Sequence, residues 1–256
     1  MTVKNNICHV LVDAVSLPEA VAAVDHLVSR REPSYVVTPN ADHIVQWQED
    51  AEFRDCYADA ALVLPDGMPL VWAGKFLGQP FKERVAGSDL FFEACALAAQ
   101  KNYRVFLLGG KKGAAEEAAL RLKTRFPGLT IAGTYCPPMG FEKDARENAK
   151  VLEAVRAARP DILLVGLGAP KQEKWIRRHY RQLEVPVSLA VGAGIDFAAG
   201  AVKRAPAWMQ KTGLEWLWRL CLEPARLWKR YLVRDMQFFW LALRQKIEER
   251  NHGMQT

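Results

Sequence analysis

The distribution of hydrophobic residues along the chain predicts a parallel α/β fold. Short apolar runs rich in β-branched residues alternate with longer amphipathic stretches of helical period. Strands that are apolar throughout are typical of a sheet covered by helices on both faces. The expected strands are residues 7–12, 35–38, 61–64, 104–109, 129–135, 161–166 and 187–192. We therefore expect a three-layer, Rossmann-like parallel sheet, at least from residue 87 onward.

Helical patterns fill most of the intervals between these strands. Ser16, Asn40 and Ser88 stand where N-caps are expected, because their side chains can accept a hydrogen bond from the first turn of a helix. The predicted helices cover residues 17–31, 88–102, 111–126, 142–159 and 170–183.

The pattern becomes purely helical after Ala205, and Pro206 and Pro224 each stand where a helix can begin. We therefore predict two parts. Residues 1–202 form a Rossmann-like α/β catalytic domain with a C-terminal helical appendage, residues 203–256, attached to it.

Charge separates the two predicted parts. The chain carries a net charge of +6, and residues 203–256 contain 11 basic and five acidic residues, so the first part is neutral. Five of the eight tryptophans lie in the same appendage: Trp208, Trp216, Trp218, Trp228 and Trp240. A basic, aromatic segment favours an anionic surface as partner. The alternative is a packed helical subdomain with a solvated basic face.

Targeting signals and cysteine pairs are missing from the sequence. The first residues do not form a secretory signal, and no stretch approaches the run of about 20 apolar residues that spans a bilayer. The five cysteines are scattered, without a CxxC pair. We expect reduced thiols and a cytoplasmic protein.

Polar and glycine-rich residues follow six of the predicted strands. Ligands of open α/β sheets bind at the carboxyl ends of the strands, so these segments are the candidate site. They are TPN (38–40), PDG (65–67), GGKKG (109–113), CPPMGF (136–141), GLGAPKQE (166–173) and GAGIDF (192–197). Together they predict a cleft of nucleotide size.

Two of these segments suit a phosphate. In GGKKG, Gly109 and Gly110 let backbone N–H groups approach an anion at a helix N-terminus, although a tight turn explains them equally well. In GLGAPKQE, Gly168 permits close approach, while Lys171 and Gln172 present a cation and an amide. A solvated helix start explains Lys171, but gives no reason for Gln172.

Four further side chains have a chemical and an ordinary interpretation. Asp66, at a strand end between Pro65 and Gly67, suits a general base of raised pKa or an Asx-turn. Arg84 suits a phosphate or a surface salt bridge. Asp196 is suited to a hydrogen bond with a nucleobase or a ribose hydroxyl, or to a place in a turn. Phe141 is suited to stacking on a nucleobase, or to ordinary packing.

Several common motifs are absent. The sequence contains no GxGxxG after the first strand, no Walker loop, no GxSxG, no HExxH and no DxD. Its five histidines are dispersed without ligand spacing. We therefore expect no metal and no cofactor.

The segments TPN, PDG, RVAGSD (84–89), GLGAPKQE and GAGIDF, in this order, resemble the TagA/WecG/CpsF family, glycosyltransferase family 26. The run RAPAWMQKTGLEWLWRLCLEPARLWKRYL (204–232) resembles it too. The resemblance extends from the first strand to about Leu232. It implies an inverting transferase of N-acetylmannosamine, its uronic acid or a related hexose from a UDP-sugar to a polyprenyl-diphosphate-linked saccharide in cell-surface polysaccharide synthesis.

The resemblance also implies roles for individual residues. Asp66 becomes the expected base. The sugar site is expected to include Thr38, Asn40 and Gln172, whereas Asp196 contacts the uracil end. Phe141 stands where this family usually has a tyrosine, at the position of the aromatic residue that would stack on the base of the donor. Phosphate or acceptor contacts are expected from Arg84 and from arginines of the appendage: Arg219, Arg226 and Arg230. The stripe Arg226, Arg230 and Arg234 recurs every four residues, as on one side of a helix.

The expected partners are a UDP-sugar, a lipid-linked acceptor and the anionic inner face of the cell membrane, to which the protein attaches peripherally. The sequence leaves open whether the chain forms a homo-oligomer.

Two other functions compete with the glycosyltransferase interpretation. One is an NAD- or S-adenosylmethionine-dependent enzyme on the same sheet. The other is a nucleic-acid-binding module, which the neutral α/β part and the lack of any recognised motif disfavour, so we expect no nucleic acid.

Overall fold

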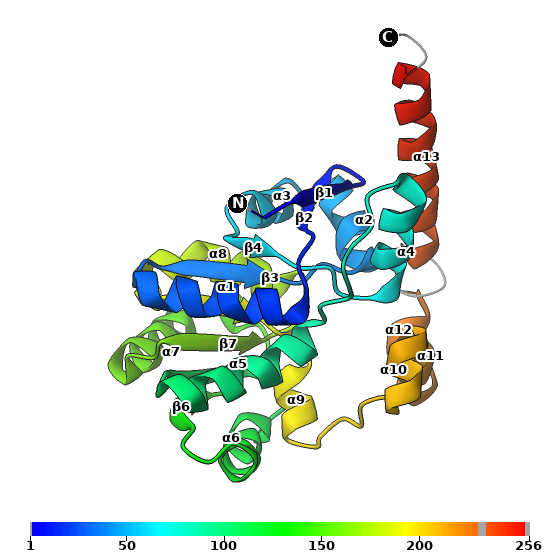
Figure 1. Cartoon of the computed structure of the whole chain (residues 1–256). Coiled ribbons are helices and arrows are strands. Elements are labelled where there is room, and N and C mark those ends of the chain that lie inside the picture. Colours follow the sequence, from blue (N-terminus) through cyan, green and yellow to red (C-terminus); the bar gives the residue numbers. More distant parts are fainter. Residues whose placement is uncertain (1, 230–233, 254–256) are drawn as a thin grey trace.

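A six-stranded parallel sheet forms the centre of the molecule (Figure 1). The computed structural model describes residues 2–229 and 234–253. The strand order is β4-β3-β8-β7-β5-β6. The strands are β3 (Ser34–Val37), β4 (Leu62–Val63), β5 (Arg104–Gly109), β6 (Thr130–Tyr135), β7 (Ile162–Gly166) and β8 (Val187–Ala190). From β5 the chain passes to β6 on one side and returns to β7 on the other. The topological switch point therefore lies between β5 and β7.

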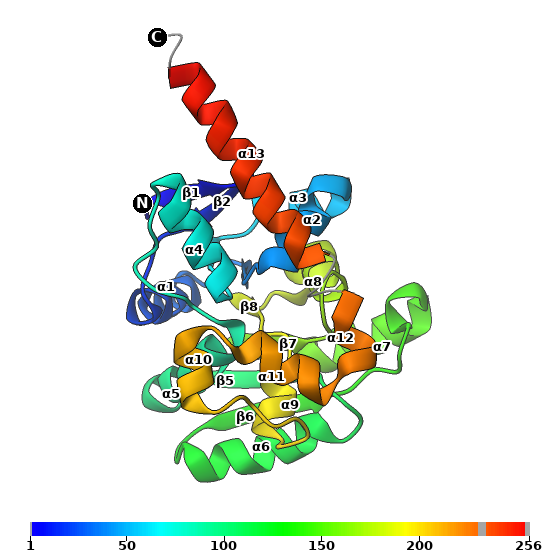
Figure 2. The ribbon, with the colours of Figure 1, turned by 90° about the vertical axis from the view of Figure 1, so that its right-hand side faces the viewer.

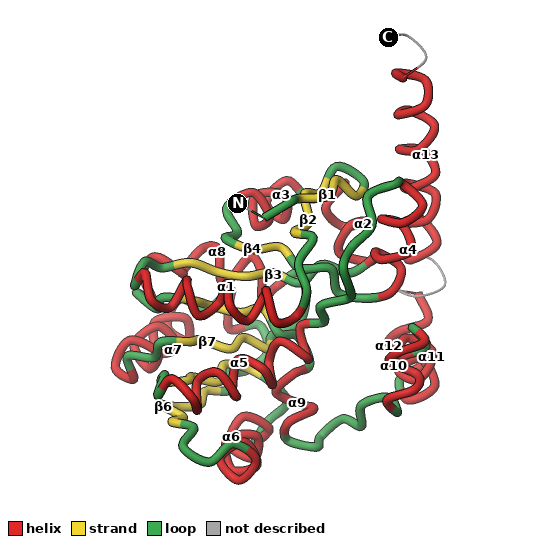
Figure 3. Tube along the Cα trace, viewed as in Figure 1, coloured by secondary structure: helices red, strands yellow, loops and turns green. Residues whose placement is uncertain are grey.

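Helices cover both faces of this sheet (Figure 3), which confirms the predicted three-layer, Rossmann-like fold. Side chains of β7 alternate between two apolar clusters, with Leu163 and Val165 in one and Ile162 and Leu164 in the other. One cluster includes α1 (Leu17–Arg30), α5 (Gly87–Lys101), α6 (Ala114–Arg125) and α9 (Gly194–Ala198). The other includes α2 (Ala41–Glu49), α3 (Ala51–Ala58), α4 (Met68–Leu77), α7 (Ala145–Ala158) and α8 (Lys171–Leu183).

The first predicted strand, residues 7–12, is wrong. The structure instead has a two-stranded antiparallel hairpin, β1 (Lys4–Ile7) and β2 (Val10–Asp13), apart from the main sheet. The chain reverses at Cys8 and His9, whose φ angles are 50° and 71°. Cys8 and His9 are not among the residues that usually form tight turns, so no local signal marks a turn there.

Two of the three predicted N-caps are confirmed. Ser16 forms a capping box with Glu19, and the Asn40 side chain accepts from the His43 N–H. The third, Ser88, is wrong because α5 begins one residue earlier, at Gly87, with Ala86 as its N-cap. The Gly87 N–H is instead satisfied by Asp66, at the end of another strand.

Helices make up the described part of the chain after Ala205. They are α10 (Ala207–Thr212), α11 (Glu215–Leu222), α12 (Pro224–Lys229) and α13 (Asp235–Gly253). Helices α10–α12 lie across the end of the sheet toward which the strands point (Figures 1 and 2). No helix in the described ranges is long and apolar enough to cross a bilayer.

The last helix packs on the α/β part. Phe238 of α13 is completely buried in the cluster that includes α2 and α4. Gln245 accepts from the Cys8 N–H at 2.6 Å and donates to the Asn6 carbonyl at 2.9 Å. The predicted boundary at residue 202 therefore does not separate two hydrophobic cores.

Candidate active site

A cleft of about 1180 Å³ opens at the carboxyl ends of the strands. It lies at the switch point, where ligands of such sheets bind. Residues of helices α10–α12 and of the strand-end loops line it together. Twelve of the predicted site residues line it: Thr38, Asn40, Asp66, Arg84, Gly109, Gly110, Phe141, Gly168, Lys171, Gln172, Asp196 and Arg219.

Asp66 is a half-buried carboxylate that lines this cleft. It follows β4, and its Oδ2 accepts the Gly87 N–H at 3.2 Å. Burial raises the pKa of Asp66 from 3.8 to about 6, against the opposing effects of the Arg84 cation and the Gly87 N–H. A carboxylate of this pKa is ionised at neutral pH, yet is a stronger base than an exposed aspartate.

The TPN segment lies beside this carboxylate, and two of its three residues, Thr38 and Asn40, line the cleft. Thr38 Oγ1 donates to the Ala190 carbonyl at 3.2 Å, which fixes the hydroxyl at the floor of the cleft. Asn40 caps α2. A Cβ at Gly87 would lie 2.7 Å from Thr38 Oγ1, so only glycine allows α5 to approach Thr38 this closely.

The loop after β7 presents an amide to the cleft. Gly168 has a φ of +78°, and α8 begins at Lys171. The Lys171 ammonium lies 3.9 Å from Glu142. Gln172 is only 2% exposed and donates to Glu173, while its buried Oε1 atom has no hydrogen-bond partner among the described residues. A buried acceptor of this kind fits a ligand hydroxyl or N–H.

The loop after β5 is shaped by close backbone contacts. A Cβ at Gly109 would lie 2.4 Å from the Gly166 carbonyl, and one at Gly110 would lie 2.9 Å from Ile195. Asp196 Oδ1 accepts the Lys111 N–H at 2.8 Å. Chain packing therefore requires glycine at both positions, and the hydrogen bond from Lys111 to Asp196 holds their loop in place. These contacts support the interpretation of both segments as turns. Gly109, Gly110 and Asp196 nevertheless line the cleft.

Two predicted contacts take a different form. Phe141 is 2% exposed and packs on Trp175, with ring centroids 6.0 Å apart, which favours ordinary packing over stacking on a base. Arg84 is an ion-pair partner, with its Nη1 and Nη2 atoms each 3.1 Å from a carboxylate oxygen, of Glu215 and Asp89 respectively.

The arginines of the appendage are placed only in part. Arg219 of α11 lines the cleft, as predicted. The backbone of Arg226 belongs to α12, but its side chain and the whole of Arg230 lie outside the described residues. Arg234 contacts Asp42 at 3.3 Å. Leu227 of α12 and Phe238 of α13, close to these arginines in the sequence, are buried, at 3% and 0% exposure.

Several lining residues were missed by the sequence analysis. Lys111 and Lys112 are exposed cations between the predicted glycines, and their position in GGKKG was the available signal. Glu215 and Trp216 of α11 also line the cleft. No local pattern marks Glu215, because its partners lie more than 100 residues away or across a loop.

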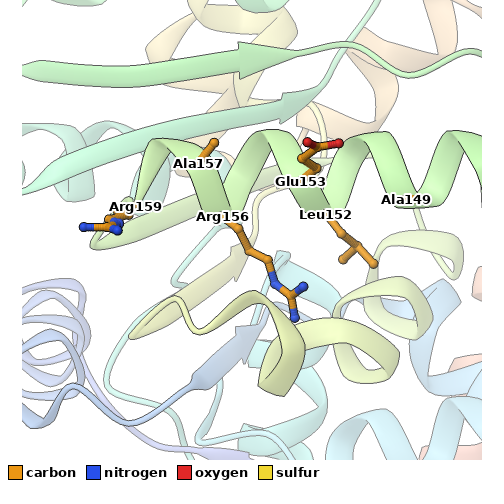
Figure 4. Close-up of a pocket in the computed structure, with 6 residues that line it drawn as sticks. All are labelled: Ala149, Leu152, Glu153, Arg156, Ala157 and Arg159. Atoms are coloured by element: carbon orange, nitrogen blue, oxygen red, sulfur yellow. The ribbon is translucent and has the colours of Figure 1, made fainter.

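A second hollow, of about 670 Å³, lies along α7 (Figure 4). Its lining residues are Ala149, Leu152, Glu153, Arg156, Ala157 and Arg159, and none of them lines the large cleft. They come from one helix and its C-cap, so no polar groups converge there from several elements. This hollow lacks the character of a ligand site.

The fold and the position of the cleft are those of a Rossmann-like α/β enzyme that binds its ligand at the strand ends. A family model described as the "Glycosyl transferase WecG/TagA/CpsF family" matches residues 5–252, and the chain belongs to this family. The predicted family and the predicted glycosyltransferase activity are thereby confirmed. The alternative of an NAD- or S-adenosylmethionine-dependent enzyme is not favoured.

Curated relatives carry one name, N-acetylglucosaminyldiphosphoundecaprenol N-acetyl-beta-D-mannosaminyltransferase. The protein of Bacillus spizizenii is 35% identical over 84% of this chain and 82% of its own. That of Bacillus subtilis strain 168 is 32% identical over 81% and 78%. That of Staphylococcus aureus strain NCTC 8325 is 31% identical over 77% and 73%.

Proposed function

We propose that this glycosyltransferase transfers N-acetylmannosamine or a related sugar from a UDP-sugar to N-acetylglucosaminyl-diphosphoundecaprenol. The acceptor and the sugar are those in the name of its relatives. The observation that carries the chemistry is Asp66, a half-buried carboxylate of raised pKa in the cleft.

In this proposal Asp66 is the general base. The acceptor hydroxyl attacks the anomeric carbon from the face opposite UDP, and the bond between that carbon and the diphosphate oxygen breaks. Asp66 takes the hydroxyl proton as the new bond forms. Its Oδ2 accepts the Gly87 N–H, while Oδ1 accepts no hydrogen bond from a described residue and is left for the proton.

The donor sugar would be oriented by Thr38, Asn40 and Gln172. The unpartnered Oε1 of Gln172 supports this assignment, because a sugar hydroxyl would supply its missing donor. Orientation of this kind contributes much of the rate enhancement in transfers between two bound substrates.

Negative charge develops on the departing UDP. We propose that it is stabilised without a metal, by protein cations and by the N-termini of α6 and α8. The cations that line the cleft include Lys111 and Lys112, which follow β5, and Arg219 on α11. In the described residues no group of three or more His, Cys, Asp or Glu side chains is placed to hold a metal ion.

The protein would act while lying on the anionic inner face of the cell membrane. Exposed apolar side chains support this placement, since Trp208 and Trp240 are each 60% exposed on helices of the basic appendage. Tryptophan is suited to the membrane interface, and each basic residue near an anionic leaflet adds about 1 kcal/mol.

The test is a direct assay of UDP release. The full chain is incubated with UDP-N-acetylmannosamine and a short-chain lipid diphosphate that carries N-acetylglucosamine. Release that depends on both substrates, with a disaccharide-lipid product, is expected. Release with no lipid product, or none with any UDP-sugar tried, would overturn the proposal.

A further inference from the structure

Four charged side chains form a closed ion network beside Asp66. Arg84 contacts Glu215 and Asp89, each at 3.1 Å. Arg204 contacts the other oxygen atoms of the same carboxylates, Asp89 Oδ1 at 2.5 Å and Glu215 Oε1 at 3.8 Å. Each arginine therefore touches both acids, and the network has no net charge.

The network joins the two predicted parts of the chain. Arg84 and Asp89 belong to the α/β part, at and just before the start of α5, whereas Arg204 and Glu215 belong to the C-terminal segment. The four side chains are only 15–25% exposed. Charges shielded from water to this degree act on one another more strongly than exposed surface pairs do.

These charges act on Asp66 in opposite directions. The Arg84 cation lowers the pKa of Asp66, whereas Glu215 and Asp89 raise it. Glu215 has two effects of the same sign, because it adds a negative charge and also occupies one end of the Arg84 guanidinium. From other elements that line the cleft, α2 contributes Asp42 and His43, and α11 contributes Arg219.

We infer that Glu215 is a positioning residue for the proposed base. By binding Arg84, the α11 carboxylate offsets the effect of that cation on Asp66, so Asp66 is a stronger base when α11 is docked on the sheet. This inference rests on the proposed function of Asp66. It assigns to the appendage a role in proton transfer that is separate from any contact with substrate or lipid.

The charge of Glu215 can be removed without removing its shape. In Glu215→Gln the side-chain oxygen still accepts from Arg84, so α11 should stay docked, while the negative charge is lost. Asp66 then becomes more acidic. The acid limb of the pH profile of kcat/KM should move to lower pH by about half a unit or more.

Two matched variants separate charge from other effects. Glu215→Asp keeps the negative charge and should return the limb toward its wild-type position. Glu153→Gln removes one carboxylate from the exposed side of α7, remote from the cleft lining, and should leave the limb in place. A limb that stays unchanged in Glu215→Gln while the melting temperature falls would show a purely structural role and overturn the inference.

A second measurement does not depend on catalysis. The titration of Asp66 can be followed by carbon NMR of its labelled carboxyl group, assigned with Asp66→Asn. The midpoint should be lower in Glu215→Gln than in the wild type, and the same midpoint in both proteins would overturn the inference. If the wild type transferred no sugar, the proposed function would fail, whereas this titration would still decide the role of Glu215.

Discussion

The main-chain N–H of Gly87 donates a hydrogen bond to Oδ2 of Asp66 over 3.2 Å. The first turn of α5 thereby orients the carboxylate of a residue that follows β4. Gly87 has no side chain, and a Cβ there would collide with Thr38 Oγ1. One glycine thus brings together the proposed base and a proposed sugar contact.

Asp66→Asn should lower turnover by about two to four orders of magnitude, the usual contribution of a positioned base. The amide oxygen can still accept the Gly87 N–H, so the fold and the affinity for UDP should hardly change. Steady-state kinetics and UDP titration by calorimetry measure the two effects. Near-normal turnover would remove Asp66 from this role.

Activity should depend on pH through Asp66. The base must be ionised, and burial raises its pKa to about 6, so kcat/KM should rise with pH up to about 6 and then level off. The rate falls at lower pH because a protonated Asp66 can no longer accept the proton of the acceptor hydroxyl. A profile that is flat between pH 5 and 7 would contradict the assignment.

Gln172→Ala should raise the KM for the donor sugar about tenfold, because one hydrogen bond from a sugar hydroxyl contributes about 1–1.5 kcal/mol. Gln182→Ala, at the exposed end of the same helix, is the control and should leave KM unchanged. Equal KM values for the two variants would exclude Gln172 from the sugar site.

Transfer should continue in an excess of chelator, since the proposed mechanism stabilises the diphosphate with lysine, arginine and helix N-termini. Initial rates with and without EDTA, after extensive dialysis, provide the measurement. Loss of activity that magnesium or manganese restores would refute the metal-free proposal.

Attachment to anionic vesicles should weaken when exposed tryptophans of the appendage are removed. The double variant Trp208→Ala, Trp240→Ala should sediment less with vesicles that contain phosphatidylglycerol, because it loses interfacial aromatic surface. Leu120→Ala, an equally exposed apolar residue on α6, is the matched control. Sedimentation unchanged in the double variant would place the contact elsewhere.

The main sheet was predictable because its strands are buried on both faces and therefore apolar throughout. The run RVFLLG, for example, is β5 from its first residue to its last. The hairpin at Cys8 and His9 was not predictable, because its turn uses residues without a turn preference and is held by distant contacts. Ser88 failed as a cap for a similar reason, since Asp66 satisfies the N–H of Gly87 from another strand.

Strand-end positions located most of the candidate site, because a parallel sheet brings all its carboxyl ends to one edge. The sequence did not predict which groups each of these side chains contacts in the folded protein. Arg84 was expected to meet a phosphate, yet two carboxylates hold it, and one of them belongs to α11. For Phe141 the sequence left stacking on a nucleobase and ordinary packing open, and the buried contact of its ring with Trp175 favours packing.

The bonds that Gln245 makes to Cys8 and Asn6 also concern the order of synthesis. Cys8 lies 237 residues before Gln245 in the sequence, and Asn6 lies 239 residues before it. On the ribosome the first hairpin is made long before the helix that completes it, and contacts of such sequence separation form late. Until α13 has been made, the Cys8 N–H lacks the Gln245 oxygen that accepts from it in the folded protein. The hairpin of β1 and β2 is therefore made well before α13, but it completes its hydrogen bonds only after α13 has been made.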